Sequence, residues 1–138
     1  MHSIRINTPA FYLMLFIWLI AGSPACKKTP PPAPGATLQI ETSPASGSVQ
    51  AAAPGPDFPL VVTVKSAMPP AGVKIDVSAR PEGSSVAFFT QSANSTNAVN
   101  NFTITGTPLA ITCVVEVTVT DLANAVNKGT ASYRYSRK

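Results

Sequence analysis

Six carboxylates and two cysteines are the side chains best suited to chemistry once the apolar start of the chain is set aside. No two of the carboxylates are adjacent and no Asp-x-Asp pattern occurs, whereas a calcium site needs clustered oxygen ligands. A glycoside hydrolase needs two carboxyl groups held about 5–10 Å apart, and nothing in this spacing predicts such a pair. We therefore expect no metal, no cofactor and no enzymatic activity. The six carboxylates are Glu41, Asp57, Asp76, Glu82, Glu116 and Asp121.

The one histidine, His2, and the one tryptophan, Trp18, both lie within the first 25 residues. If those residues are removed, the chain keeps no histidine, which excludes Ser-His-Asp and Cys-His nucleophiles and zinc sites built on His and Cys clusters. The formal net charge of +4 is spread over several segments. It does not form the basic patch of a nucleic-acid-binding protein, so we expect no nucleic-acid partner.

An apolar run of 11 residues, 11–21, precedes the first cysteine. A membrane-spanning helix needs about 20 apolar residues, so this run is too short to span. It fits the apolar core of a secretory signal, with Arg5 ahead of it and small residues from Ala21 to Ala25 behind it. We therefore predict that residues 1–25 form a signal peptide.

Two outcomes of cleavage are open at Cys26. Cleavage after Ala25 by the general signal peptidase leaves Cys26 as an ordinary first residue. The segment also resembles a bacterial lipoprotein signal, in which Ala25 and Cys26 match the motif, whereas Ser23 stands where that family favours leucine. The resemblance implies that Cys26 carries acyl chains such as palmitate and that the protein is anchored in the cell envelope, at the outer membrane. Whether it faces the periplasm or the outside stays open.

Residues 27–36, KKTPPPAPGA, contain four prolines in ten positions. Such a segment favours the extended polyproline II form and spans on the order of 30 Å. We interpret residues 26–36 as the lipidated cysteine and a spacer that separates it from residues 37–138.

From residue 37 onward, apolar and polar residues alternate with period two between clusters of Gly, Pro, Asn and Ser. This alternation is typical of strands with one buried face. Ile111, Cys113, Val115, Val117 and Val119 share one such face, so we expect Cys113 to pack in the core as a small apolar side chain. We predict strands at 37–41, 58–66, 73–80, 86–91, 101–105, 111–121 and 129–136, with 49–53 as a short continuation of the first.

Seven short strands in about a hundred residues predict an all-β, antiparallel sandwich. The pattern over 37–138 resembles the immunoglobulin-like superfamily in strand number, strand length and alternation. The paired cysteines and the core tryptophan of true immunoglobulin domains are missing, and Ile111 stands where their corner tyrosine is expected. The resemblance therefore implies an architecture and no receptor function.

Two polar loops, 92–100 and 121–128, are the predicted contact surface, because sandwich domains carry recognition on their loops. Whether the two loops lie at the same end depends on strand pairing, which the sequence does not give. The partner is a protein or a glycan of unknown identity, and the oligomeric state stays open. The candidate contact residues are Asn94, Asn97, Asn100, Asp121, Asn124 and Asn127.

Together these patterns predict a lipid-anchored envelope protein whose sandwich domain binds or organises other macromolecules without catalysis. The alternative is a carbohydrate-binding accessory module of an envelope system that handles glycans. That alternative requires at least two exposed, coplanar aromatic side chains. Tyr133 and Tyr135 share their strand face with Ala131, which indicates burial instead.

Overall fold

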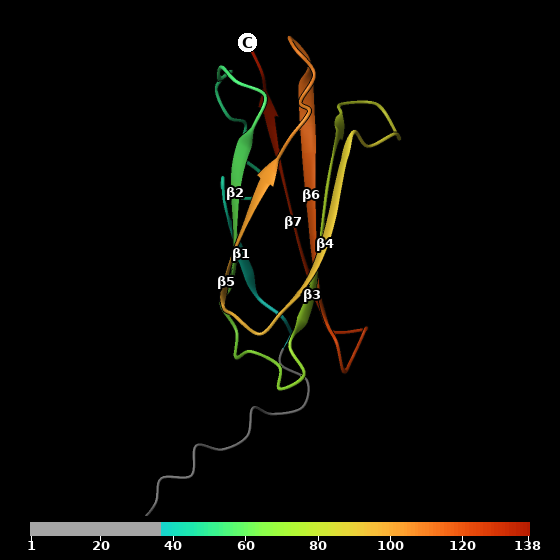
Figure 1. Cartoon of the computed structure of the whole chain (residues 1–138). Coiled ribbons are helices and arrows are strands. Elements are labelled where there is room, and N and C mark those ends of the chain that lie inside the picture. The colour runs from blue at the N-terminus through green and yellow to red at the C-terminus, as the bar shows by residue number, and fades with distance from the viewer. Residues whose placement is uncertain (1–36) are drawn as a thin grey trace, which may run out of the picture. The chain divides into compact units, whose positions relative to one another are not determined.

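Seven strands and no helix make up residues 37–138, the part of the chain that the computed structural model describes (Figure 1). The predicted signal peptide, Cys26 and the spacer lie outside the described residues. The predicted all-β class is confirmed. No helix within residues 37–138 is long and apolar enough to cross a membrane. The strands are β1 (Ile40–Ser43), β2 (Phe58–Val64), β3 (Val73–Pro81), β4 (Phe89–Ser95), β5 (Val99–Ile104), β6 (Thr112–Asp121) and β7 (Lys128–Ser136).

The strands form two sheets that face each other as a β-sandwich (Figure 1). One sheet has the order β1-β2-β5 and the other has the order β4-β3-β6-β7. Every neighbouring pair within the sheets is antiparallel. Strands β2 and β3 are consecutive in the chain but lie in different sheets, so the two sheets are tied together by the loops between them.

The core lies between the sheets and is built from the alternate residues that the sequence placed inward. On β2 the inward side chains are Leu60, Val62 and Val64, each no more than 4% exposed. The same alternation holds on β3, β6 and β7. Ile111 departs from it: β6 begins one residue later, and the Ile111 side chain is 44% exposed.

The fourth predicted strand was wrong in position. The sequence placed it at 86–91, but β4 runs from Phe89 to Ser95, and Val86 lies in an exposed turn. β4 is the edge strand of its sheet and pairs only with β3, and none of its seven residues is fully buried. Only Phe89 and Ala93 of β4 pack partly against the core, so its period-two apolar signal is weak and residues 92–95 resembled a loop.

The segment 49–53 was also predicted wrongly, as a continuation of the first strand. It crosses to the other sheet and runs parallel to β7, forming isolated bridges there. The Gln50 N–H donates to the Arg134 carbonyl at 2.8 Å, and the Arg134 N–H donates to the Ser48 carbonyl at 2.9 Å. The crossing follows Pro44, whose peptide bond with Ser43 is cis.

Candidate functional site

The predicted contact residues lie at one end of the sandwich. Val73, at the start of β3, pairs with Ser95 at the end of β4 and with Asp121 at the end of β6. The loops that follow those two strands therefore leave the same edge of the sheet, which the sequence could not establish. The 96–98 connection, the 122–127 loop and the loop between β2 and β3 all reach this end (Figure 1). We call it the loop end.

Residue 37, the first described residue, also lies at the loop end. The Leu38 N–H donates a hydrogen bond to Asn127 Oδ1 at 2.8 Å. Close by, the Lys65 N–H donates to the Gln39 carbonyl at 2.8 Å. The chain before residue 37 must therefore join the sandwich at this end.

The loop predicted at 92–100 is much shorter in the structure. Asn94 lies in β4 and Asn100 lies in β5, so only 96–98 connects the two strands. The Asn97 N–H donates to Ser95 Oγ at 3.0 Å, and Asn100 Nδ2 donates to the Asn97 carbonyl at 2.9 Å. Asn97 and Asn100 therefore hold this tight turn in shape.

The polar residues of the 122–127 loop bond mainly to one another. Asp121 Oδ1 accepts from the Ala123 N–H at 2.8 Å, and Asp121 Oδ2 accepts from Asn127 Nδ2 at 3.3 Å. Asn124 Oδ1 accepts from the Val126 N–H at 3.3 Å. Three side chains that the sequence suggested for a partner therefore fix the conformation of the loop.

The side chains that the loop end presents to solvent include apolar ones, which sequence reasoning missed. Val126 is 88% exposed, Val99 is 54% exposed and Leu122 is 46% exposed. A signal was present in the sequence: Leu122 and Val126 fit no strand alternation and lie among polar loop residues. Isolated exposed apolar residues are common, so this signal alone was weak.

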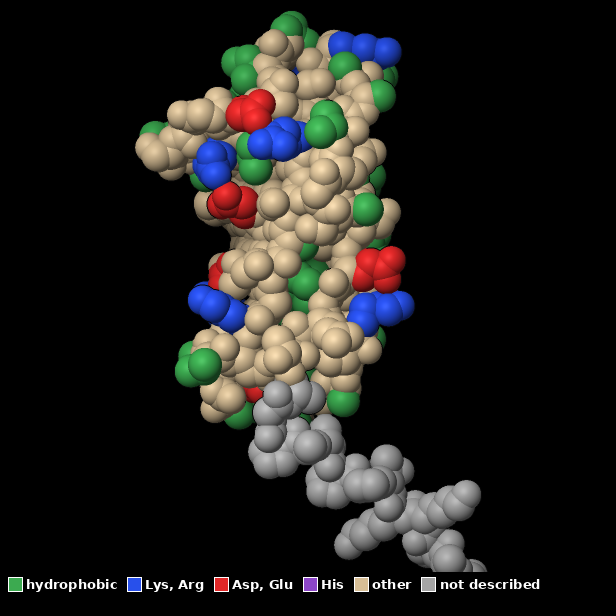
Figure 2. All heavy atoms as spheres, turned by 180° about the vertical axis from the view of Figure 1, so that it is seen from behind, with side chains coloured by type: hydrophobic (Ala, Val, Ile, Leu, Met, Phe, Trp, Pro, Cys, Tyr) green, Lys and Arg blue, Asp and Glu red, His purple; other side chains and the backbone are tan. Residues whose placement is uncertain are grey.

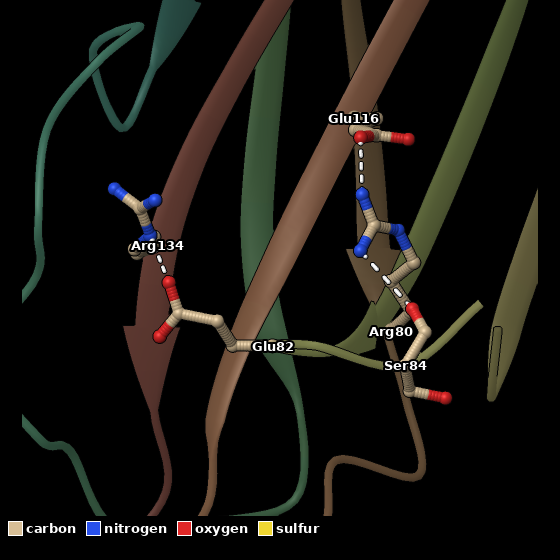
Figure 3. Close-up of polar contacts among 5 residues, drawn as sticks. All are labelled: Arg80, Glu82, Ser84, Glu116 and Arg134. Carbon is tan, nitrogen blue, oxygen red and sulfur yellow. Dashed lines mark hydrogen bonds and ion pairs between the residues drawn. The ribbon is translucent and has the colours of Figure 1, made fainter. Parts of the chain in front are cut away.

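The carboxylates do not gather into a reactive cluster. Glu116 Oε1 accepts from Arg80 Nη2 at 2.6 Å, and Glu82 Oε1 accepts from Arg134 Nε at 2.6 Å (Figure 3). Acidic and basic side chains lie as scattered neighbours on the face that Figure 2 shows. No group of three potential metal ligands occurs within residues 37–138.

Asp76 has a perturbed carboxyl group, and its surroundings explain why. Ser92 Oγ donates a short hydrogen bond to Asp76 Oδ1, and Lys74 Nζ lies 3.0 Å from the same oxygen. The Ser92 hydrogen bond lowers the pKa of Asp76 most, partial burial opposes it, and Lys74 lowers it further. The Asp76 carboxylate is therefore ionised at neutral pH and has no proton to donate. Its two neighbours lie on β3 and β4.

Cys113 and the two tyrosines are core residues, as the alternation predicted. Cys113 is fully buried and free, and burial raises the pKa of its thiol. Tyr133 and Tyr135 are each 2% exposed. Burial raises the pKa of both phenols, that of Tyr135 to about 12. A buried, protonated thiol is a poor nucleophile.

Aromatic side chains offer no flat surface for stacking a sugar ring. Of the six aromatic residues between 37 and 138, none is exposed. The Phe58 and Tyr135 rings pack against each other at a centroid distance of 4.6 Å, with their planes tilted by 58°. The carbohydrate-binding alternative needs at least two exposed aromatics, so this observation does not favour it.

A groove of about 280 Å³ opens between segment 50–53 and the start of β2. Its lining is mostly apolar and includes Phe58, Tyr133 and Tyr135, and no Lys, Arg, Asp or Glu lines it. Sites for small organic ligands typically enclose about 300–1,000 Å³. The groove lies at the lower limit of that range, and its polar side chains are those of Ser43, Gln50 and the two tyrosines.

Neither the comparison with protein-family models nor the comparison with curated proteins finds a match for this chain. The functional argument therefore depends on the residues and their geometry alone.

Proposed function

We propose that this protein is a lipid-anchored cell-envelope protein, with acyl chains on Cys26 and a non-catalytic immunoglobulin-like domain that binds or organises other macromolecules. The observation that carries the proposal is the order of parts along the chain. An export-type apolar run, small residues, Cys26 and a proline-rich spacer directly precede a sandwich. We assign the protein to the outer membrane by the same resemblance.

The strand order supports the immunoglobulin-like assignment. In such sandwiches the first, second and fifth strands share a sheet, and the third, sixth and seventh strands share the other. Here β1-β2-β5 and β3-β6-β7 follow that division. The fourth strand joins β3, as an added strand does in variable-type domains, and not β5 as in constant-type domains.

The state of the ionisable side chains supports a role without catalysis. Four of the six carboxylates form ion pairs with lysine or arginine, and Asp121 caps its own loop. The one cysteine within residues 37–138 is buried. Catalytic acids and nucleophiles usually stand in clefts with perturbed pKa values. Asp76 and Cys113 have shifted pKa values, but the Asp76 side chain is 39% exposed and paired with Lys74, and Cys113 is buried in the core.

The intact mass of the protein purified from a bacterial host tests the proposal. We expect wild type in the membrane fraction, with an N-terminal Cys26 that is heavier by its acyl chains. Cys26→Ser is expected in the soluble fraction, while Cys113→Ser, the matched control, keeps the lipid. An unmodified Cys26 in a membrane-free wild-type protein overturns the anchor.

A further inference from the structure

We propose that the 122–127 loop inserts its tip, Leu122 and Val126, into the surface of the bilayer that holds the lipid anchor. The inference rests on the proposed lipid anchor. It adds a second membrane contact, made by the domain itself, and it fixes which end of the sandwich faces the lipid.

Position is the first argument. Residue 37 lies at the loop end, and Asn127 of the 122–127 loop holds the Leu38 N–H. Ten residues separate an acylated Cys26 from residue 37. An anchor attached through so short a spacer keeps the loop end near the bilayer at a high effective concentration. Even a weak affinity of the loop for lipid is then sufficient for contact.

Exposure is the second argument. Val126 is 88% exposed and Leu122 is 46% exposed, and Ala123 and Ala125 between them are exposed as well. The segment 122–126 contains no charged residue. The free energy falls when apolar side chains leave water for the boundary between head groups and acyl chains.

The N–H groups of the loop backbone are the third argument. Acyl chains offer no acceptor to a backbone N–H, so an inserting loop must satisfy these donors itself. The Leu122 N–H donates to the Gly72 carbonyl at 3.1 Å and the Asn127 N–H donates to the Asn124 carbonyl at 2.9 Å.

The other N–H groups of the loop also donate to acceptors within the protein, with one exception. Asn124 donates to the Asp121 carbonyl, while Ala123 and Val126 donate to the side chains of Asp121 and Asn124. Only the Ala125 N–H has no acceptor within the described residues. The loop backbone therefore has almost no free N–H donor to offer a protein partner.

The test uses the full chain, processed in a bacterial host and reconstituted into vesicles of phosphatidylethanolamine and phosphatidylglycerol. Trp18 leaves with the signal peptide, so Val126→Trp introduces the only tryptophan of the processed protein. Leu109→Trp is the matched control, because Leu109 is 61% exposed in the β5–β6 connection at the opposite end. Lipids with brominated acyl chains quench a tryptophan that enters the bilayer.

We expect Val126→Trp to shift its emission to shorter wavelength and to lose roughly half of its fluorescence to brominated lipid, as an interfacial side chain should. Leu109→Trp is expected to change in neither respect. Adding Leu122→Asp to Val126→Trp should abolish the quenching, whereas adding it to Leu109→Trp should change nothing. Circular dichroism verifies that each variant is folded.

Vesicle cosedimentation separates the two proposals. Protein that cosediments through Cys26 but shows equal, unquenched emission from both tryptophan variants overturns the docking and leaves the anchor standing. Protein that fails to cosediment overturns both. Quenching of both variants to the same extent also overturns the docking, because it assigns no particular end to the lipid.

Discussion

The backbone N–H of Leu38 donates a hydrogen bond to Oδ1 of Asn127 at 2.8 Å, across 89 positions of sequence. Asn127 also donates from Nδ2 to Asp121 at 3.3 Å. One side chain therefore connects the start of the sandwich to the loop between β6 and β7.

Replacing Asn127 by alanine leaves the part-buried Leu38 N–H without this acceptor. We expect Asn127→Ala to lower the free energy of unfolding by about 1–3 kcal/mol, the usual cost of an unsatisfied polar group. Hydrogen exchange at Leu38 should accelerate. Asn94→Ala, at an exposed β4 position, is the control and should cost little. Urea denaturation measures both, and equal costs would contradict the role given to Asn127.

The two core tyrosines should respond differently to loss of the hydroxyl. Tyr135 Oη and Thr107 Oγ1 share a buried hydrogen bond of 2.8 Å, whereas the buried Tyr133 hydroxyl has no partner within the described residues. We expect Tyr135→Phe to cost about 1–2 kcal/mol and Tyr133→Phe to be neutral or stabilising. In a double-mutant cycle, Thr107→Val with Tyr135→Phe should cost less than the sum of the single changes. Additive costs would show that the pair is not coupled.

Stability should fall in alkali because the folded state holds Tyr135 protonated. Burial raises the pKa of Tyr135 to about 12, above its ordinary value near 10. Its contribution to stability is therefore fully present below pH 10 and is lost as the pH rises toward 12. The free energy of unfolding of Tyr135→Phe, measured over that range, should decline less steeply than that of wild type. If the free energies of unfolding of Tyr135→Phe and wild type declined equally with pH, Tyr135 would not be the source of the alkaline loss.

Gly72 cannot accept a side chain at the loop end. Its φ is +84°, and an added Cβ would lie 2.7 Å from the Ser95 carbonyl oxygen of β4. Gly55 is a close control, because its φ is +98° and an added Cβ would meet nothing within 4 Å. We expect Gly72→Ala to cost at least about 1 kcal/mol more than Gly55→Ala, because steric overlap adds to the shared backbone strain. Equal melting temperatures would show that β4 moves aside freely.

The two arginine pairs on the β4-β3-β6-β7 sheet should differ in their contribution to stability. The Arg134 side chain is 52% exposed and bonds Glu82 alone, so Arg134→Ala should cost less than about 1 kcal/mol. The Arg80 side chain is 29% exposed and also donates from Nη1 to the Ser84 carbonyl at 3.1 Å (Figure 3). Arg80→Ala should cost more and should depend less on salt. Thermal unfolding at low and high ionic strength measures the cost of each variant. A larger cost for Arg134→Ala than for Arg80→Ala would refute the prediction.

Sequence alone predicted the strands that have one buried face. Ile75, Val117 and Tyr133 alternate with polar residues because one side of each strand meets the opposite sheet. The edge strand β4 was misplaced because, after Phe89, it carries only small or polar residues such as Ser92. Period-two patterns record burial, so a strand with little burial leaves a weak pattern.

The candidate site was predictable in part. Asp121 and Asn127 were found as loop residues from composition, but their bonds to each other and to Leu38 depend on the antiparallel pairing of β6 with β7. Strand pairing is a long-range property that local sequence does not encode. The exposed Val126 was overlooked for a related reason: an apolar residue in a loop has meaning only when its surroundings in space are known.

Segment 47–53 runs alongside β7, from the Ser132 carbonyl to the Lys138 N–H. This leaves β4 as the long open edge of the four-stranded sheet. Pairing of two molecules through β4 would occupy that edge in both of them, so the four-stranded sheet by itself offers a route to a closed pair and none to a fibril, which requires an open strand on both sides of every subunit.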